Sequence, residues 1–136
     1  MSRLRETKKS RYEVGQVWTY KTRPGEEEST FTIVKINSHA KMGNIIHLFL
    51  EGVRIRNPMQ EEGFSDLIPH MPFSEDAVAQ SAVKMIRKVT KLPEFEEGYD
   101  VWKESFDEGE AGVFTTSLAQ GLDYLEKSIN EDGVSY

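Results

Sequence analysis

The sequence of 136 residues contains no cysteine, which excludes disulfide bonds, thiolate nucleophiles and cysteine-ligated metal centres. Long hydrophobic runs are also missing: the longest, Ile45 to Leu50, is interrupted by His47 and falls far short of the ~20 residues of a membrane-spanning helix. The first 15 residues are charged and contain no apolar stretch, so a secretory signal is not expected. We therefore expect a soluble cytoplasmic protein with no membrane partner.

Basic residues are scarce in the last third of the chain. Residues 94–136 hold twelve carboxylates against only Lys103 and Lys127, a net charge of −10, whereas residues 1–12 carry a net charge of +4 and the residues between are balanced. We predict a basic flexible arm over residues 1–12, followed by a single α+β domain over residues 13–136. Such a charge asymmetry bears on partners and association rates rather than on the fold.

The first half of the sequence has the composition of β-strands. Three segments are rich in β-branched and aromatic residues, namely Gly15 to Thr22, Thr30 to Ile36 and Ile45 to Ile55. Between the first two, residues 23–26 read Arg-Pro-Gly-Glu, in which proline and glycine suit the two central positions of a type II turn. Consecutive strands joined by short turns favour an antiparallel sheet or a small barrel, here of three to five strands.

The second half shows helical periodicity. Ser74 is a predicted N-cap of a helix that ends at Pro93, and a second helix is predicted from Pro93 to Asp107. Residues 110–115 form a candidate final strand, and residues 117–120 a capping box for a last helix. We expect two or three helices to pack on the sheet through apolar stripes, formed by Val78, Ala82, Met85, Ile86 and Val89, by Phe95, Tyr99, Trp102 and Phe106, and by Leu118, Leu122, Leu125 and Ile129.

Three stretches of the sequence carry a resemblance. They are Gly15 to Thr30 with its Thr-Arg-Pro-Gly-Glu turn, residues 70–76 (His-Met-Pro-Phe-Ser-Glu-Asp), and residues 97–106 (Glu-Gly-Tyr-Asp-Val-Trp-Lys-Glu-Ser-Phe) through the Gly-Val-Phe-Thr of residues 112–115. Together they resemble an uncharacterised family of small bacterial α+β proteins over most of residues 13–130. The resemblance implies a bacterial or phage-linked origin and brings no activity, cofactor or catalytic residue with it.

The three histidines offer little to a metal or catalytic site. No pair stands at helical i, i+3 or i+4 spacing, so zinc binding is not supported. We expect His47 to be hydrogen-bonded within a strand and His39 to be a solvated loop residue. His70 lies in a stiff Pro-His-Met-Pro segment that leads to the helix start at Ser74. His70 and Ser74 are candidate anion or ligand contacts, and the imidazole of His70 beside Ser74 is a candidate general base. The structural alternative is a rigid turn with a packed histidine.

Carboxylates cluster along the predicted second helix, opposite its aromatic stripe. This acidic face is either an ordinary solvated surface or a docking surface for a cationic protein. Its predicted partner-binding members are Glu96, Glu97, Asp100, Glu104, Asp107 and Glu108. We expect the two other glutamate clusters, Glu26 to Glu28 and Glu61 to Glu62, to be solvated.

Two arginines suggest a different partner. Arg54 and Arg56 share one face of the third predicted strand, and with the basic arm they are candidate phosphate contacts. Trp18 and Tyr20 also share a strand face, as in small β-barrels that bind single-stranded nucleic acid. The acidic last third of the chain opposes this interpretation, because it repels a polyanion.

These observations leave three hypotheses for function. The first is a non-enzymatic binding module that holds a cationic protein on its acidic face, in the manner of bacterial immunity proteins, antitoxin-like proteins or phage-encoded inhibitors. The second is a nucleic-acid-binding accessory protein that uses the basic arm and the strand aromatics. The third is a small enzyme centred on His70. No catalytic residue, metal or cofactor is assigned, and the oligomeric state is left open.

Overall fold

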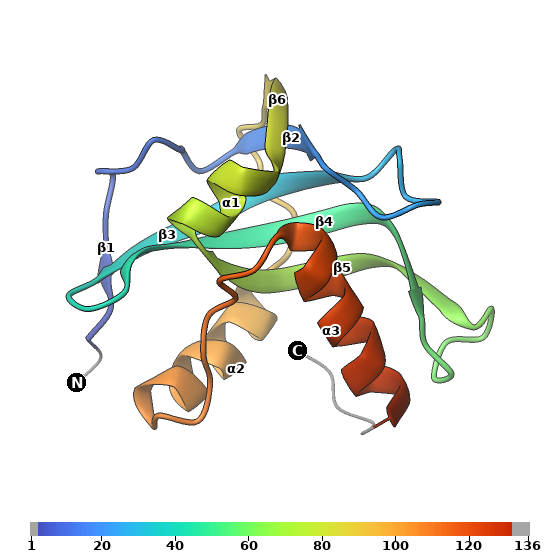
Figure 1. Cartoon of the computed structure of the whole chain (residues 1–136). Helices are drawn as coiled ribbons and strands as arrows, with labels where there is room; N and C mark the ends of the chain where they lie inside the picture. Colours follow the sequence, from blue (N-terminus) through green and yellow to red (C-terminus); the bar gives the residue numbers. More distant parts are fainter. Residues whose placement is uncertain (1–2, 132–136) are drawn as a thin grey trace.

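A computed structural model describes residues 3–131 and has an α+β fold, in which an open antiparallel sheet carries helices on both faces (Figure 1). The order along the sheet is β5-β4-β3-β2-β6, and β1 pairs with β3. The elements are β1 (Arg5–Glu6), β2 (Gln16–Tyr20), β3 (Thr30–His39), β4 (Gly43–Arg56), β5 (Phe64–Ser74), α1 (Glu75–Ser81), β6 (Ala82–Lys88), α2 (Glu96–Asp107) and α3 (Leu118–Glu131). The structure confirms the predicted fold class, and the sheet is open rather than closed into a barrel.

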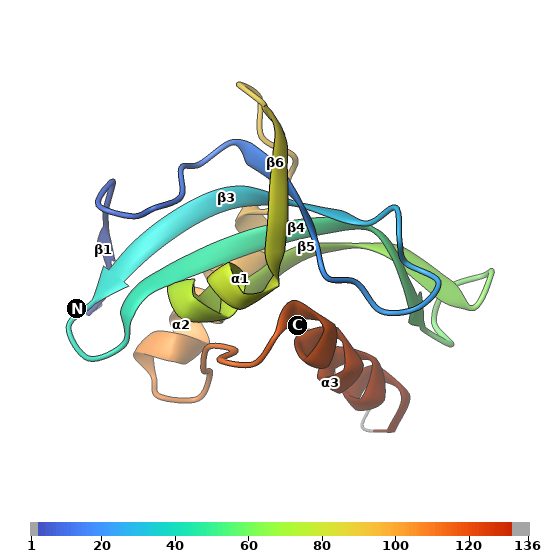
Figure 2. The ribbon, with the colours of Figure 1, turned by 45° about the horizontal axis from the view of Figure 1, so that its top comes forward.

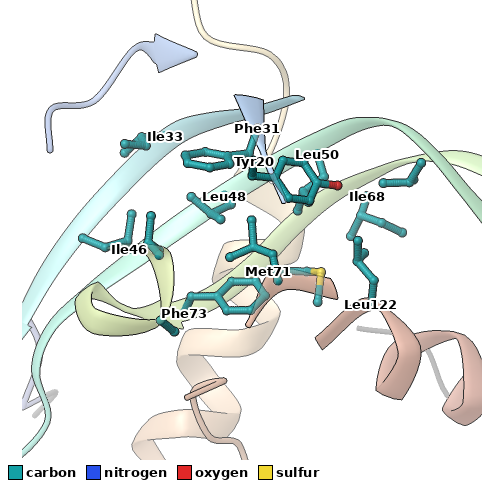
Figure 3. Close-up of a cluster of buried hydrophobic side chains, with 14 of the residues drawn as sticks. Tyr20, Phe31, Ile33, Ile46, Leu48, Leu50, Ile68, Met71, Phe73 and Leu122 are labelled. Carbon is teal, nitrogen blue, oxygen red and sulfur yellow. The ribbon is translucent and has the colours of Figure 1, made fainter. Parts of the chain in front are cut away.

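The sheet separates two hydrophobic layers. On one face, α1 and α3 pack on side chains of β3, β4 and β5, and Leu122 of α3 points toward this cluster, which includes Leu48, Met71 and Phe73 (Figure 3). On the other face, α2 packs its aromatic stripe against β3 and β4. Figure 2 shows α1 in front of the sheet, part of α2 behind it and α3 below it. Helices on both faces explain why residues 45–50 of β4 are buried at every position instead of at alternate ones.

Several local predictions are confirmed. The N–H of Glu26 donates to the carbonyl of Arg23 at 3.1 Å, and Gly25 has a φ of 89°, as a type II turn requires. The capping box of α3 is reciprocal: the N–H of Gln120 donates to Ser117 Oγ at 3.2 Å, and the N–H of Ser117 donates to Gln120 Oε1 at 3.3 Å.

The first predicted helix is much shorter than expected. Ser74 does cap it, because the N–H of Ala77 donates to Ser74 Oγ at 3.2 Å, but α1 ends at Ser81. The next residues form β6, which pairs with β2 and leaves Val83 61% and Met85 44% exposed. The helical prediction for residues 82–89 is therefore wrong. Pairing with the open edge of β2 satisfies the backbone hydrogen-bonding groups of this segment, which contains valine and isoleucine. This stabilisation exceeds the helix preference that the spacing of its apolar residues indicated.

Two predictions beside the β5 edge are also wrong. Pro69 and Pro72 do not form a turn but lie within β5, an edge strand, where the missing N–H groups of proline are tolerated. The strand predicted at residues 110–115 is reduced to one bridge between Phe114 and Phe73. There, Phe114 N–H donates to the Pro72 carbonyl and Ser74 N–H donates to the Phe114 carbonyl, both at 2.9 Å.

The segment predicted as a flexible arm runs along the sheet in the structure. β1 pairs with the end of β3, placing Arg5 opposite Ser38, and the side chains of Leu4 and Tyr12 are buried. Residues 1–2 of the predicted arm and residues 132–136 of the predicted domain lie outside the described residues.

Candidate functional site

Two of the three histidines form a buried pair beneath α2. His47 lies on β4 and His70 on the neighbouring strand β5, with 0% and 3% of their surfaces exposed. Their rings stack at a centroid distance of 5.0 Å, and His47 Nδ1 lies 2.8 Å from His70 Nε2. The prediction that His47 is a hydrogen-bonded sheet residue is confirmed, and His70 is packed as the structural alternative proposed.

A hydrogen-bonded chain fixes the protons of this pair. His47 Nε2 lies 2.7 Å from Asn37 Oδ1, and the hydroxyl of Tyr99 donates to the same oxygen at 3.1 Å. With the amide oxygen of Asn37 placed toward both partners, His47 carries its proton on Nε2, because a carbonyl oxygen only accepts. His47 Nδ1 is then the acceptor, and His70 Nε2–H donates to it. The remaining nitrogen, His70 Nδ1, carries a free lone pair.

Both imidazoles are neutral near pH 7. Burial lowers the pKa of His70 to about 4. Burial also lowers the pKa of His47 well below its ordinary value, and the nearby His70 and Lys35 lower it further because each disfavours a second positive charge. The pair therefore works as a hydrogen-bonding unit and not as a cation.

Aromatic residues of α2 enclose the pair. Tyr99 and Trp102 stand edge-on to the His47 ring, each with a centroid distance of 4.9 Å, and Trp102 Nε1–H donates to the carbonyl of Gly112 at 2.8 Å. Gly98 brings the helix close to His70: a Cβ at this position would lie 3.1 Å from the His70 Cβ. The predicted aromatic stripe is confirmed as core, and it also shapes the surroundings of the histidines.

A groove of about 860 Å³ opens beside this cluster. Its described lining residues include four glutamates and no lysine or arginine. They are Pro69, His70, Glu94, Phe95, Glu96, Glu97, Gly98, Val101, Trp102, Ser105, Glu110 and Ala111.

His70 contributes an exposed acceptor to this groove. Among residues 3–131, no sealed side-chain nitrogen or oxygen lacks a hydrogen-bond partner. The His70 ring forms one hydrogen bond, through Nε2. Its Nδ1 has no partner among residues 3–131, so this atom is not sealed and we place it at the groove that His70 lines.

Only part of the predicted acidic face lines the groove. Glu96 and Glu97 line the groove, whereas Asp100, Glu104, Asp107 and Glu108 are not among its lining residues. Asp107 accepts a hydrogen bond from Lys103 Nζ at 3.2 Å. Structure therefore brings two of the six predicted carboxylates together with His70, and adds Glu94 and Glu110, which sequence reasoning did not select.

The other predicted site residues lie elsewhere. The hydroxyl of Ser74 caps α1, and Ser74 does not line the groove. Arg54 lies over the ring of Phe64 at 4.3 Å, near the C-terminal end of β4. β1 pairs with the opposite end of the sheet, where Ser38 faces Asn44. The basic segment and the two arginines, Arg54 and Arg56, therefore do not form one continuous patch.

Two further predictions about polar residues are wrong. Glu26 is not solvated but 2% exposed, and it binds the guanidinium of Arg23 through both oxygens, at 2.8 and 2.7 Å. His39 is not a solvated loop residue: it ends β3 and stands edge-on to Phe106 at a centroid distance of 5.6 Å. Glu61 and Glu62 are exposed, as expected.

Sequence reasoning missed Asn37 and Gly98 as parts of the site. A signal existed for a buried network, since His47 interrupts the most apolar segment of the chain and a buried imidazole needs polar partners. Which partners it meets depends on the registers of β3, β4 and β5, and these are long-range features.

Residues 3–131 contain no group of three or more histidine, aspartate or glutamate residues arranged to hold a metal ion. None of the helices described in that range has the length and hydropathy needed to cross a bilayer.

Comparisons with protein-family models, with curated proteins and with solved structures give no match to this chain. The resemblance to small bacterial proteins therefore stays a prediction.

Proposed function

We propose that this protein is a non-enzymatic binding module that holds a cationic protein partner in the acidic groove beside α2. The observation that carries the proposal is the composition of the groove: its described lining includes four glutamates and the aromatic residues Phe95 and Trp102, but no lysine or arginine. A bacterial immunity protein, an antitoxin-like protein or a phage-encoded inhibitor, located in the cytoplasm, is the class that fits.

The physical basis is electrostatic complementarity. A concave surface of one charge sign concentrates the opposite charge, which raises association rates and excludes partners of the wrong sign. The exposed carboxylates of Asp100, Glu104 and Glu108 extend the negative field along α2 beyond the groove. Only Lys103 interrupts this field within α2, and it is paired with Asp107.

The two alternative functions have less support. A general base works best when its pKa lies near the working pH, and burial lowers the pKa of His70 to about 4. Nucleic-acid binding needs a continuous basic surface, but Arg54 and Arg56 lie at the end of β4 remote from β1.

A charge-reversal experiment tests the proposal. The variant Glu96→Lys/Glu97→Lys removes two carboxylates from the groove. The matched control, Glu61→Lys/Glu62→Lys, makes the same change in net charge at two exposed residues outside it. Fluorescence anisotropy measures binding of a labelled peptide of alternating lysine and serine at about 150 mM salt, where long-range charge effects are screened.

We expect the groove variant to bind at least about tenfold more weakly, which corresponds to about 1.4 kcal/mol, and the control to change the dissociation constant by less than about twofold. Circular dichroism verifies that both variants are folded. Equal weakening in both variants, or no binding by the unmodified protein, would contradict the proposal.

A further inference from the structure

We infer that His70 Nδ1 is the specific acceptor in the groove for one N–H group of a lysine or arginine side chain of the partner. This inference rests on the proposed function and names the contact that selects the partner. It makes the buried histidine pair a recognition device, in which His70 touches the ligand while His47 and Asn37 position it.

The first step is the direction of the hydrogen-bonded chain. Asn37 Oδ1 accepts from both His47 Nε2, at 2.7 Å, and the Tyr99 hydroxyl, at 3.1 Å. The proton on His47 Nε2 leaves Nδ1 as an acceptor, 2.8 Å from His70 Nε2. This arrangement holds the His70 proton on Nε2, so the groove receives a lone pair and not an N–H.

The second step is the exposure of that lone pair. His70 is 3% exposed, and the one atom of its ring system that needs a partner faces the groove. Because so little of His70 is exposed, a hydrogen bond formed at Nδ1 lies in surroundings of low dielectric constant, where it is stronger than at the helix surface. A ligand that reaches Nδ1 therefore gains more than one that stays on the helix surface.

The third step is the selection of the donor. Lysine and arginine side chains have only donors, and the four glutamates of the groove attract their charge while repelling carboxylates and phosphates. Phe95 and Trp102 supply aromatic surface to the alkyl part of such a side chain. A neutral amide can donate to Nδ1 but gains nothing from the glutamates.

The fourth step is access. Gly98 lines the groove beside His70, and a side chain there would begin 3.1 Å from the His70 Cβ. Glycine within a helix is less favourable than alanine. Its presence keeps the approach to the imidazole free of a side chain.

Nitrogen NMR of the intact protein, labelled with [15N]histidine, tests the inference directly. In the free protein at pH 7 we expect His70 Nε2 to be protonated and Nδ1 to be unprotonated. Titration with methylguanidinium or methylammonium should move the Nδ1 resonance saturably toward the hydrogen-bonded range, and the more effective of the two identifies arginine or lysine as the inserted residue. N-methylurea, a neutral donor, and acetate, an anion, should cause smaller or no shifts.

A pair of variants provides a second measurement with the alternating lysine–serine peptide. His70→Leu removes the acceptor and should weaken binding about tenfold, as expected for a lost hydrogen bond to a charged group. His70→Gln retains an acceptor and should recover most of that loss. If His70→Leu does not fold, the NMR titration of the unmodified protein decides.

The outcomes separate the two proposals. One outcome is that the peptide binds, Glu96→Lys/Glu97→Lys weakens this binding, and the Nδ1 resonance responds to neither cation. In that case the inference about His70 is overturned and the proposed function stands. The opposite tautomer in the free protein overturns it as well. If neither the peptide nor the small cations bind, both proposals fail.

Discussion

At the scale of single residues, the buried histidine pair makes the stability of the folded protein depend on pH. The pKa of His70 is about 4 in the folded protein, below the ordinary 6.5, because burial disfavours the charged ring. Between these values the unfolded chain binds more protons than the folded protein, so stability decreases as the pH falls. The contribution is complete above about pH 6.5 and amounts to about 3 kcal/mol for His70, with His47 acting in the same direction.

We predict that the free energy of unfolding, measured with urea, falls steeply from pH 6.5 to pH 5. Because His70→Gln removes one of the two titrating groups, its curve should be flatter over this interval. A stability that stays constant between pH 6.5 and pH 5, or an unchanged slope in the variant, would show that the imidazoles do not carry the coupling.

At the scale of elements, one glycine sets the distance between α3 and the sheet. A Cβ at Gly121 would lie 2.9 Å from two carbons of the Phe73 ring, and that ring is fully buried. Phe73 belongs to the edge strand β5, and the ring of Phe114 lies at a centroid distance of 5.2 Å from it. The ring therefore has little room to move, and α3 fits only because position 121 lacks a side chain.

We predict that Gly121→Ala destabilises the protein by about 1–2 kcal/mol, because the steric cost of overpacking exceeds the better helix propensity of alanine. Gly112→Ala is the matched control, since nothing lies within 4 Å of its added Cβ. Thermal unfolding followed by circular dichroism measures both. A stabilised Gly121→Ala variant would mean that the ring moves more easily than its burial implies.

At the scale of the whole molecule, the N-terminal segment contributes to both hydrophobic layers. Leu4 packs into the cluster under α2, and Tyr12 into the cluster under α1 and α3. The N–H of Thr7 donates to the carbonyl of Ile36 at 3.3 Å, between these two positions. The segment that was predicted to be a flexible arm therefore packs into the hydrophobic clusters on both faces of the sheet.

We predict that deletion of residues 1–12 lowers the free energy of unfolding by about 3 kcal/mol or more, because two buried side chains are lost. The control variant Lys8→Ser/Lys9→Ser removes charge from exposed positions of the same segment and should unfold at nearly the same urea concentration as the unmodified protein. Similar stability of the deleted and complete chains would identify the segment as dispensable.

Sequence by itself determined the features that depend on neighbouring residues. The turn at residues 23–26, the capping box before α3 and the aromatic stripe of α2 all follow from residues three to eleven positions apart. Such short-range patterns are read from the chain because the backbone geometry that joins their residues is nearly fixed. The α+β class follows from them.

Tertiary structure decided where elements compete or meet at a distance. Residues 82–88 have a helical spacing, but an open strand edge on β2 was available, and pairing with it made β6. Glu26 became buried because Arg23 and the backbone of Arg54 bind it there. The histidine chain forms because the registers of β3, β4 and β5 place His47 between His70 and Asn37, residues 23 and 10 positions away from it in the chain, while α2 covers them. Long-range pairing depends on the free energy of the whole fold, and no local pattern specifies it.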